Sequence, residues 1–242
     1  MDSSTFNTGG RYNPVLVFWT PITTTNAPSV RAGHTAVWTG KEILVWGGQD
    51  GHGLFADGGR YNAALDAWTP MTTTNAPSPR FEHTAVWTGS DMLIWGGRSC
   101  FGCVAGLRDG ARYNPTTDTW SPVTTTNAPS SRLAYPAVWT GNEMIVWGGS
   151  YSSRDHQGTT WTMGLNDGAR YDAATDTWTP ITTTNAPKPR FLHTAVWTGR
   201  EMLVWGGAYS SSPWGGGYFL NDGGRYLAIQ TLYLPLSLRS EP

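Results

Sequence analysis

Short apolar stretches separated by turn-forming residues run through most of this chain, and they repeat. The segment at 31–48, RAGHTAVWTGKEILVWGG, recurs from residues 80, 132 and 190 with few changes. In each copy, two runs of β-branched and aromatic residues flank Trp-Thr-Gly and a polar pair, which is typical of a β-hairpin. The Gly-Gly at the end of each copy stops the second strand. The chain is therefore expected to contain four similar hairpins.

A second type of hairpin is predicted between these copies. It begins with Gly-Gly-Arg-Tyr or Gly-Ala-Arg-Tyr, and in its first four occurrences a Trp follows seven residues after the Tyr. Polar residues such as Asn-Pro-Thr-Thr-Asp at 114–118 lie between the two aromatic residues and favour a turn. The pairs are Tyr12/Trp19, Tyr61/Trp68, Tyr113/Trp120 and Tyr171/Trp178. Two successive hairpins give a repeating unit of four strands.

The spacing of the repeat indicates its architecture. The distance from the Arg of Arg-Tyr to the Trp of Trp-Gly-Gly is 35 residues in all four copies, and the length varies only after Trp-Gly-Gly. A four-stranded unit of about 50 residues, with Gly-Gly after one strand and spaced Tyr and Trp in the next two, resembles the kelch β-propeller family. The resemblance implies an all-β fold in which four-stranded sheets, called blades, stand around an axis. It says little about function, because propellers include both binding modules and enzymes.

We expect about four blades in a single domain that covers residues 9–236, with tails at 1–8 and 237–242. The repeats are 31–75, 80–127, 132–185 and 190–236. After the last Gly-Gly-Arg-Tyr, at 223–226, the pattern of the other copies is lost. Most of the 14 Trp occupy repeat positions, and we attribute them to packing between blades.

An open propeller would expose a blade face and a strand edge. We therefore expect the strands at 9–22 to pair with the last blade and close the ring. Closure could occur within a monomer, or in a dimer that exchanges the closing strands and forms an eight-bladed ring. The alternative is that the C-terminal copy keeps its own outer strands, so that 9–22 begins an incomplete fifth blade.

Charge and composition narrow the range of partners. The formal net charge is −1 and Lys and Arg form no cluster, which argues against nucleic acid or an anionic membrane as the main partner. No apolar run is long enough to span a membrane, and the N-terminus lacks the apolar core of a signal peptide. We expect a soluble chain, exported only if a leader is absent from the sequence. Cys100 and Cys103 favour a local disulfide over free thiols.

The segments of variable length predict a working surface. In up-and-down blades they all lie on one side of the propeller, and binding residues are commonly found on such loops. They are 49–57, 98–109, 150–167 and 208–222. Their aromatic residues are typical of surfaces that bind proteins or carbohydrates, although some could instead cover the core. These residues are Tyr151, Trp161, Tyr209, Trp214, Tyr218 and Phe219.

Four arginines, Arg31, Arg80, Arg132 and Arg190, open the innermost strands on the same side. Each has an Asp at the end of the following insertion, at 57, 109, 167 and 222. We favour Arg–Asp pairs or Arg-to-backbone bonds that hold the loops. The alternative is a ring of guanidinium groups that binds a carboxylate or a phosphate.

Three residues after each arginine come His34, His83, Tyr135 and His193. Pseudo-symmetry places them at one height around the axis, where three imidazoles could bind zinc or another divalent metal and activate a water molecule. Glu82 or Tyr135 would then transfer the proton. The favoured alternative is that each ring bonds to neighbouring backbone without a metal. Some kelch-like propellers are copper oxidases, but this chain lacks a counterpart to their Tyr, His and thioether-linked Cys ligands.

These observations favour a binding module that uses the side with the insertions to bind a protein or a carbohydrate. A metal-dependent hydrolase of esters or phosphoesters, with the three histidines on the axis, is the alternative. The sequence contains no Gly-x-Ser-x-Gly motif, phosphate-binding loop or dinucleotide fingerprint.

Overall fold

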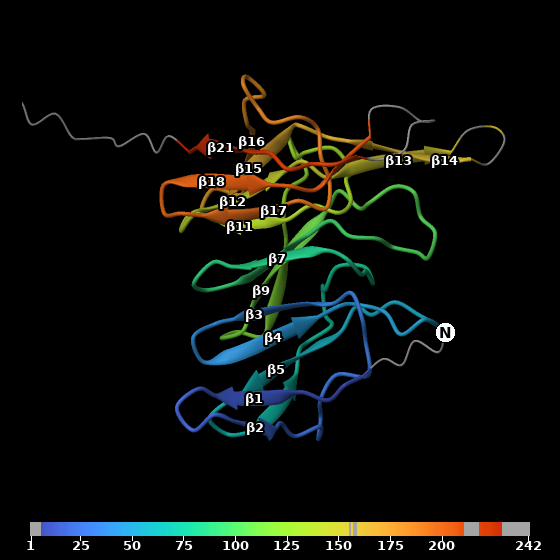
Figure 1. Ribbon diagram of the computed structural model, residues 1–242. Coiled ribbons are helices and arrows are strands. Elements are labelled where there is room, and N and C mark those ends of the chain that lie inside the picture. Colours follow the sequence, from blue (N-terminus) through green and yellow to red (C-terminus); the bar gives the residue numbers. More distant parts are fainter. Residues whose placement is uncertain (1–5, 155, 157–158, 211–217, 229–242) are drawn as a thin grey trace, which may run out of the picture.

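The computed structural model describes residues 6–154, 156, 159–210 and 218–228, which form β-strands and no helix (Figure 1). Three antiparallel sheets have four strands each, in sequence order. The first contains β3 (Thr35–Trp38), β4 (Glu42–Trp46), β5 (Gly58–Asn62) and β6 (Ala67–Pro70). The second contains β7 (Thr84–Trp87), β8 (Met92–Trp95), β9 (Gly110–Asn114) and β10 (Thr119–Pro122). The third contains β11 (Ala137–Trp139), β12 (Glu143–Trp147), β15 (Gly168–Asp172) and β16 (Thr177–Pro180). The predicted four-stranded unit is therefore confirmed.

The hydrophobic core is divided into three layers, each between two consecutive sheets. In the first layer, Leu44 and Trp46 of β4 pack with Met92 and Ile94 of β8 and with Trp120. Alternate residues of a strand point to opposite faces, so β8 and β12, the second strands of the two middle blades, each contribute to two layers. Equivalent clusters join the second sheet to the third and the third to the last. The repeat pattern thus specifies packing between blades as well as strands.

The last blade has three strands in the part of the chain that the structure describes. They are β17 (Thr194–Trp197), β18 (Glu201–Trp205) and β21 (Gly223–Leu227). At the other end of the chain, β1 (Gly10–Asn13) and β2 (Phe18–Pro21) pair with each other and with no other described strand. The closure that we expected, between 9–22 and the last blade, is not seen, because β18 pairs with β21 instead. Both candidate strands carry Gly-Gly-Arg-Tyr, and β21 is the one that lies closer to β18 along the chain.

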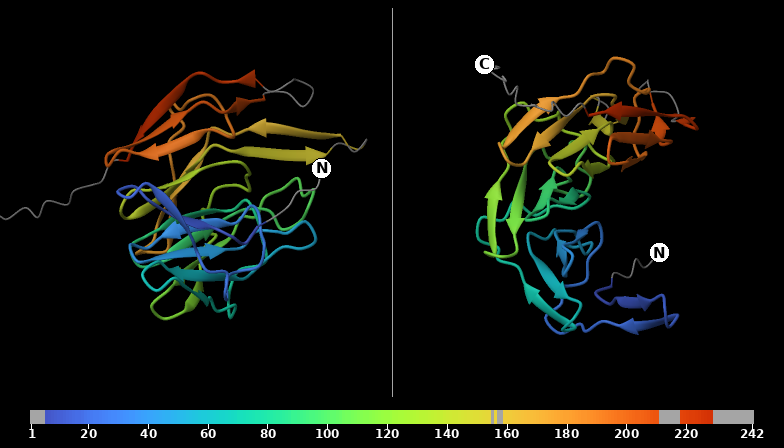
Figure 2. Two further views of the ribbon diagram at one scale, coloured as in Figure 1. Left: turned by 60° about the horizontal axis from the view of Figure 1, so that its bottom comes forward. Right: turned by 90° about the vertical axis from the view of Figure 1, so that its left-hand side faces the viewer.

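The sheets follow one another along an arc that stays open on one side (Figure 2). The β1–β2 hairpin lies at one end of this arc and the last blade at the other. Arg11 Nη1 donates to the carbonyl of Ala63, and Thr23 N–H donates to Asp66. These bonds attach the N-terminal segment to the turn between β5 and β6 of the first sheet, as the alternative of an incomplete additional blade requires.

The variable insertions lie on one side of the arc, at the right in Figure 1, and the short Trp-Thr-Gly turns lie on the opposite side. We call the first the insertion side. Two insertions form hairpins there, β13 (Ser150–Arg154) with β14 (Thr160–Gly164), and β19 (Ala208–Tyr209) with β20 (Tyr218–Phe219). Cys100 and Cys103 form a disulfide in another insertion.

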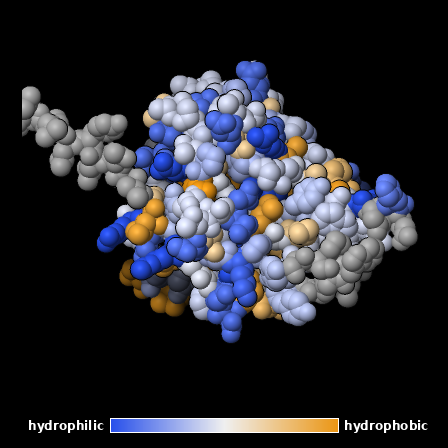
Figure 3. Space-filling model, turned by 90° about the horizontal axis from the view of Figure 1, so that it is seen from above, coloured by the Kyte–Doolittle hydropathy of each residue, from blue (hydrophilic) through white to orange (hydrophobic). Residues whose placement is uncertain are grey.

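Seen from above, the surface carries hydrophobic side chains in small groups among hydrophilic ones (Figure 3). Among the described residues, no helix is long and apolar enough to cross a membrane.

Candidate functional site

Each of the four repeat arginines is buried and bonded to its own blade. Arg31 donates from Nε to Ser29 O, from Nη1 to Gly47 O and Asp57 O, and from Nη2 to Ser29 Oγ and Asp57 Oδ1. All five N–H groups of this guanidinium therefore have acceptors. The ion pairs Arg80–Asp109, Arg132–Asp167 and Arg190–Asp222 repeat the arrangement at 2.8 to 3.1 Å. These bonds support the loop-holding interpretation, and they leave the guanidinium groups little capacity for a ligand.

The histidines lie at the junctions between blades. His83 Nε2 is 2.7 Å from Thr35 Oγ1 of the preceding blade, and its ring meets Trp46 edge-on with the centroids 5.3 Å apart. His193 meets Trp147 in the same way at 5.4 Å. His34 is exposed, and in the described part of the chain only the β1–β2 hairpin, which carries no Trp-Gly-Gly, precedes its blade. At this repeat position, an imidazole therefore packs against the Trp of Trp-Gly-Gly in the preceding blade.

Burial keeps these two junction histidines neutral. Desolvation, with the charge of Arg80 adding to it, lowers the pKa of His83 to about 3. Desolvation and Arg190 lower the pKa of His193 to about 4. Within the described residues, no three His, Cys, Asp or Glu side chains come together at a site that could hold a metal ion. The structure therefore does not gather His34, His83 and His193 into the zinc site that we considered.

The two residues considered for proton transfer also have other partners. The Tyr135 hydroxyl lies 3.4 Å from the carbonyl of Trp95, and burial raises the pKa of this phenol. The carboxylate of Glu82 accepts a hydrogen bond from Arg98 Nε at 2.7 Å. Both side chains therefore have partners within the protein, a cation for Glu82 and a backbone carbonyl for Tyr135.

The residue two positions after each repeat arginine has a left-handed backbone conformation, and these residues lie at the inner rim of the arc. Gly33, Glu82, Ala134 and Leu192 occupy the same repeat position and have φ between 54° and 64°. The N–H of Glu82 donates to Gly33 O, and that of Leu192 donates to Ala134 O. This φ is uncommon for residues other than glycine and costs about 1 kcal/mol or more. The strained backbone directs the Glu82 and Leu192 side chains to a hollow on the rim.

This rim hollow has a volume of about 540 Å³. It combines the Glu82–Arg98 ion pair, hydroxyl groups from β13 and β14, and the exposed side chain of Leu192. Ser152 Oγ and Thr162 Oγ1 lie 2.8 Å apart on its wall. Its lining residues are Glu82, Arg98, Ala134, Tyr135, Ser150, Ser152, Thr162, Phe191 and Leu192. The hollow therefore offers charges of both signs, hydrogen-bonding groups and an apolar contact.

The predicted aromatic residues lie on the two insertion hairpins. Tyr151 and Trp161 meet edge to face, with ring centroids 5.7 Å apart. They lie on the face of β13–β14 opposite to Ser152 and Thr162, because side chains alternate across a strand. The remaining aromatics are Tyr209 and Tyr218, which are paired across β19 and β20, and Phe219. Trp214 lies outside the described residues.

The two hairpins and the rim hollow adjoin one another. Gly164 N–H donates to Ser210 O, which joins the end of β14 to the segment after β19. Phe191, which lines the hollow, exchanges backbone hydrogen bonds with Ala208 of β19. Phe219 is 91% exposed and Tyr218 is 69% exposed. The insertion side thus presents a hollow with exposed aromatic side chains on a hairpin next to it.

Sequence reasoning missed several lining residues, above all Arg98, Ser150 and Leu192. Arg98 and Ser150 stand directly after Trp-Gly-Gly, where the other copies have Gln49 and Ala208. This variable position at the start of each insertion could have been recognised as part of the surface. Leu192 carried no signal, because its backbone conformation is apparent only in the folded chain.

One family model matches the chain over residues 2–207, and its description is KLHDC2/KLHL20/DRC7 Kelch-repeats domain. The match covers most of the described strands, including β1 and β2 at one end of the arc and β18 at the other.

Proposed function

Because the chain belongs to the kelch-repeat family, whose repeats are in general protein-interaction modules, we propose that it binds a segment of a partner protein on the insertion side. The observation that carries this proposal is the rim hollow beside the exposed β19–β20 hairpin. No repeat dictates this hairpin, so its exposed aromatic side chains are not explained by the propeller core.

The chemistry of the hollow suits a polypeptide. An extended peptide presents backbone donors and acceptors together with charged and apolar side chains, and the hollow offers partners for each of these. Glu82 and Arg98 could each bind an opposite charge if their mutual ion pair opens, and they are partly exposed. Phe219 and Tyr218 would add apolar contact next to the hollow, and aromatic residues are common among the dominant contacts of interfaces.

A carbohydrate is a weaker candidate for the same surface. Sugars commonly stack on one flat, exposed aromatic face. Tyr151 and Trp161 are inclined at 69° to each other, so the pair does not provide a single flat platform. No described group favours hydrolysis of a bound ligand.

The proposal can be tested with peptides selected from a random library displayed on phage. The affinity of a selected synthetic peptide would be measured by calorimetry for the wild-type chain and for Leu192→Ser and Phe219→Ser. Both side chains are exposed, so their replacement should not unfold the protein. We expect each change to weaken binding by about 30-fold, the effect of losing a dominant interface contact worth about 2 kcal/mol.

Leu65→Ser is the matched control, because Leu65 is equally exposed but lies in a turn on the opposite side. Loss of binding in Leu65→Ser, or unchanged binding in both insertion-side variants, would contradict the proposal. A glycan array gives the remaining outcome. Glycan binding that depends on Phe219, with no peptide selected, would replace the protein partner by a carbohydrate.

A further inference from the structure

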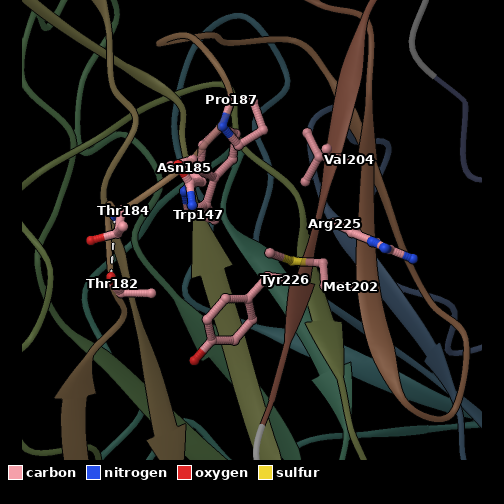
Figure 4. Close-up of a pocket in the computed structure, with 11 residues that line it drawn as sticks. Trp147, Thr182, Thr184, Asn185, Pro187, Met202, Val204, Arg225 and Tyr226 are labelled. Carbon is pink, nitrogen blue, oxygen red and sulfur yellow. Dashed lines mark hydrogen bonds between the residues drawn. The ribbon is translucent and has the colours of Figure 1, made fainter.

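Two hollows occupy equivalent repeat positions at the two ends of the arc. The C-terminal hollow lies on the last blade, between its linker residues Thr182 and Thr184 and the strand residues Met202 and Val204 (Figure 4). The N-terminal hollow lies on the first blade, beside His34, Ile43, Val45 and Trp68. Ile43 and Val45 stand at the same places in the repeat as Met202 and Val204. Each hollow therefore lies at a junction between blades at which one of the usual packing side chains is missing.

The complete junctions show what the C-terminal hollow lacks. Fourth-strand tryptophans donate from Nε1 to the first Thr carbonyl of the preceding linker, as Trp68 does to Thr23, Trp120 to Thr72 and Trp178 to Thr124, each at 3.0 Å. By the same rule, the carbonyl of Thr182 should accept a hydrogen bond from Nε1 of a fourth-strand Trp in the last blade. Both Thr182 and Trp147, the other expected contact of that Trp, line the C-terminal hollow.

The N-terminal hollow lacks the opposite component. At the complete junctions, the Trp of Trp-Gly-Gly packs against the fourth-strand Trp of the next blade, at 5.3 Å for Trp46–Trp120 and 4.6 Å for Trp95–Trp178. Trp46 also contacts the histidine of that blade. Trp68 and His34 would be the corresponding partners in the first blade, and both line the N-terminal hollow.

The chain carries both missing tryptophans in exposed positions. Trp205 is the Trp-Gly-Gly residue of the last blade and is 62% exposed. Trp19 is the fourth-strand residue of the N-terminal hairpin and is 69% exposed. Its ring packs against Tyr12 at a tilt, with centroids 5.3 Å apart, as Trp68 packs against Tyr61 at 5.1 Å. The hairpin therefore already has the form of the outer pair of a blade.

We propose that two copies of this chain associate head to tail, with β1–β2 of each copy completing the last blade of the other. In this arrangement β1 takes the place of β21 beside β18, Trp19 fills the C-terminal hollow, and Trp205 fills the N-terminal hollow of the partner. Two such contacts join two arcs into one closed ring of eight blades, so no blade face is left open.

A second copy fits these sites better than the same chain does. Arg11 Nη1 donates to Ala63 O, as Arg60 does to Pro115 O and Arg112 to Ala173 O at the complete junctions. The hairpin is thus fixed to the first blade by a standard junction, at the far end of the arc from the C-terminal hollow. Closing one chain would require a tighter angle at every junction, and close packing resists such changes.

The replacement of β21 is favoured by its missing partner, because no described fourth strand pairs with its outer edge, although β18 pairs with it over five residues. Its residues alternate between exposed and partly buried, whereas β5, β9 and β15 are largely buried. Arg225 lies 3.9 Å from Glu201, compared with 3.2 Å for Arg60 and Glu42. The sequence offers one competitor for the C-terminal hollow, because Tyr233 stands seven residues after Tyr226. Residues 229–242 lie outside the described part of the chain.

The first test is the mass in solution, by size-exclusion chromatography with light scattering. The wild-type chain should have twice the mass of 26.3 kDa. Trp19→Ser and Trp205→Ser should each raise the dissociation constant of the dimer at least about 30-fold. Phe219→Ser, on the insertion side, is the matched control and should stay dimeric. A monomeric wild-type chain, or dissociation unaffected by both Trp variants, would overturn the proposal.

The second test fixes the register with a disulfide. Leu203 faces Arg225 across β18 and β21, so β1 in the same register places Arg11 opposite Leu203 of the other copy. The Cα atoms of such directly opposite pairs lie about 4.5 to 5.5 Å apart, within the range that a disulfide spans. Oxidised Arg11→Cys/Leu203→Cys protein should therefore migrate as a covalent dimer, and the chain without the added cysteines should not.

Two other results of the second test would each overturn the proposal. A cross-linked monomer would show that one chain closes on itself. Failure to cross-link in the double variant, with a truncated chain 1–228 that is less stable than the full chain, would show that the chain's own tail occupies the C-terminal hollow.

Discussion

At the scale of single residues, one repeat position serves different purposes according to its neighbours. His83 and His193 pack under the Trp of the preceding blade, whereas His34 has the same sequence context but faces a junction that is incomplete. The sequence predicted that these rings share a height around the axis. It could not show that they point sideways into junctions, because direction depends on the neighbouring blade. The three-histidine metal hypothesis depended on that missing information.

The buried histidines should make stability depend on pH. The folded-state pKa of about 3 for His83 and about 4 for His193 lies below the ordinary value near 6.5. The unfolded chain therefore takes up protons first as the pH falls, and the folded state loses stability below pH 6.5. Each histidine can cost up to about 1.4 kcal/mol for each pH unit. Urea unfolding at pH 7, 6 and 5 should show this decline.

His83→Gln should flatten this pH dependence, since Gln does not titrate, and His52→Gln at an exposed position is its control. An unchanged slope in His83→Gln would contradict the assignment of a neutral, buried imidazole.

Val17 illustrates a second residue-scale effect. It has φ 55° in the β1–β2 turn, where the other copies have Asp66, Asp118 and Asp176. Left-handed φ is least favourable for a β-branched residue. Each of the three aspartates also accepts a hydrogen bond from the Tyr five residues earlier, at 2.6 to 2.7 Å.

Val17→Asp should therefore relieve strain and give Tyr12 an acceptor. We expect about 1 kcal/mol more stability for the hairpin, measured as slower backbone hydrogen exchange in β1 and β2. Val15→Asp, at a neighbouring exposed position, should leave the exchange rates unchanged. Equal effects from both substitutions would point to charge or solubility in place of backbone strain.

At the scale of elements, local patterns predicted the hairpins of the repeats well, because the turn and the alternation of apolar residues are contained in each copy. The insertion hairpins β13–β14 and β19–β20 were not predicted as strands, since their Ser-rich and Gly-rich sequences lack a clear alternation. Closure of one chain through 9–22 is not seen, for another reason. β1 and β21 share Gly-Gly-Arg-Tyr, so the sequence offers β18 two equivalent neighbours and no way to choose between them.

At the scale of the whole molecule, the repeated junction sets the arc and gathers the insertions on one side. Backbone bonds such as Gly48 N–H to Arg80 O and Gly149 N–H to Arg190 O recur between consecutive blades. From strand direction alone, the sequence predicted that the insertions lie together on one side. It did not predict the rim hollow, because that depends on left-handed residues from three blades, Glu82, Ala134 and Leu192, and on hydroxyl groups from an insertion.

The central claim is that the insertion side is the binding surface, and hydrogen-exchange mass spectrometry with a bound selected peptide tests it most directly. The peptide should slow exchange in β13, β14, β19 and β20 and at Phe191 and Leu192, which surround the rim hollow and form the neighbouring hairpin. The Trp-Thr-Gly turns on the opposite side should exchange as in the free protein. Slower exchange confined to those turns, with none around the rim hollow, would contradict the account.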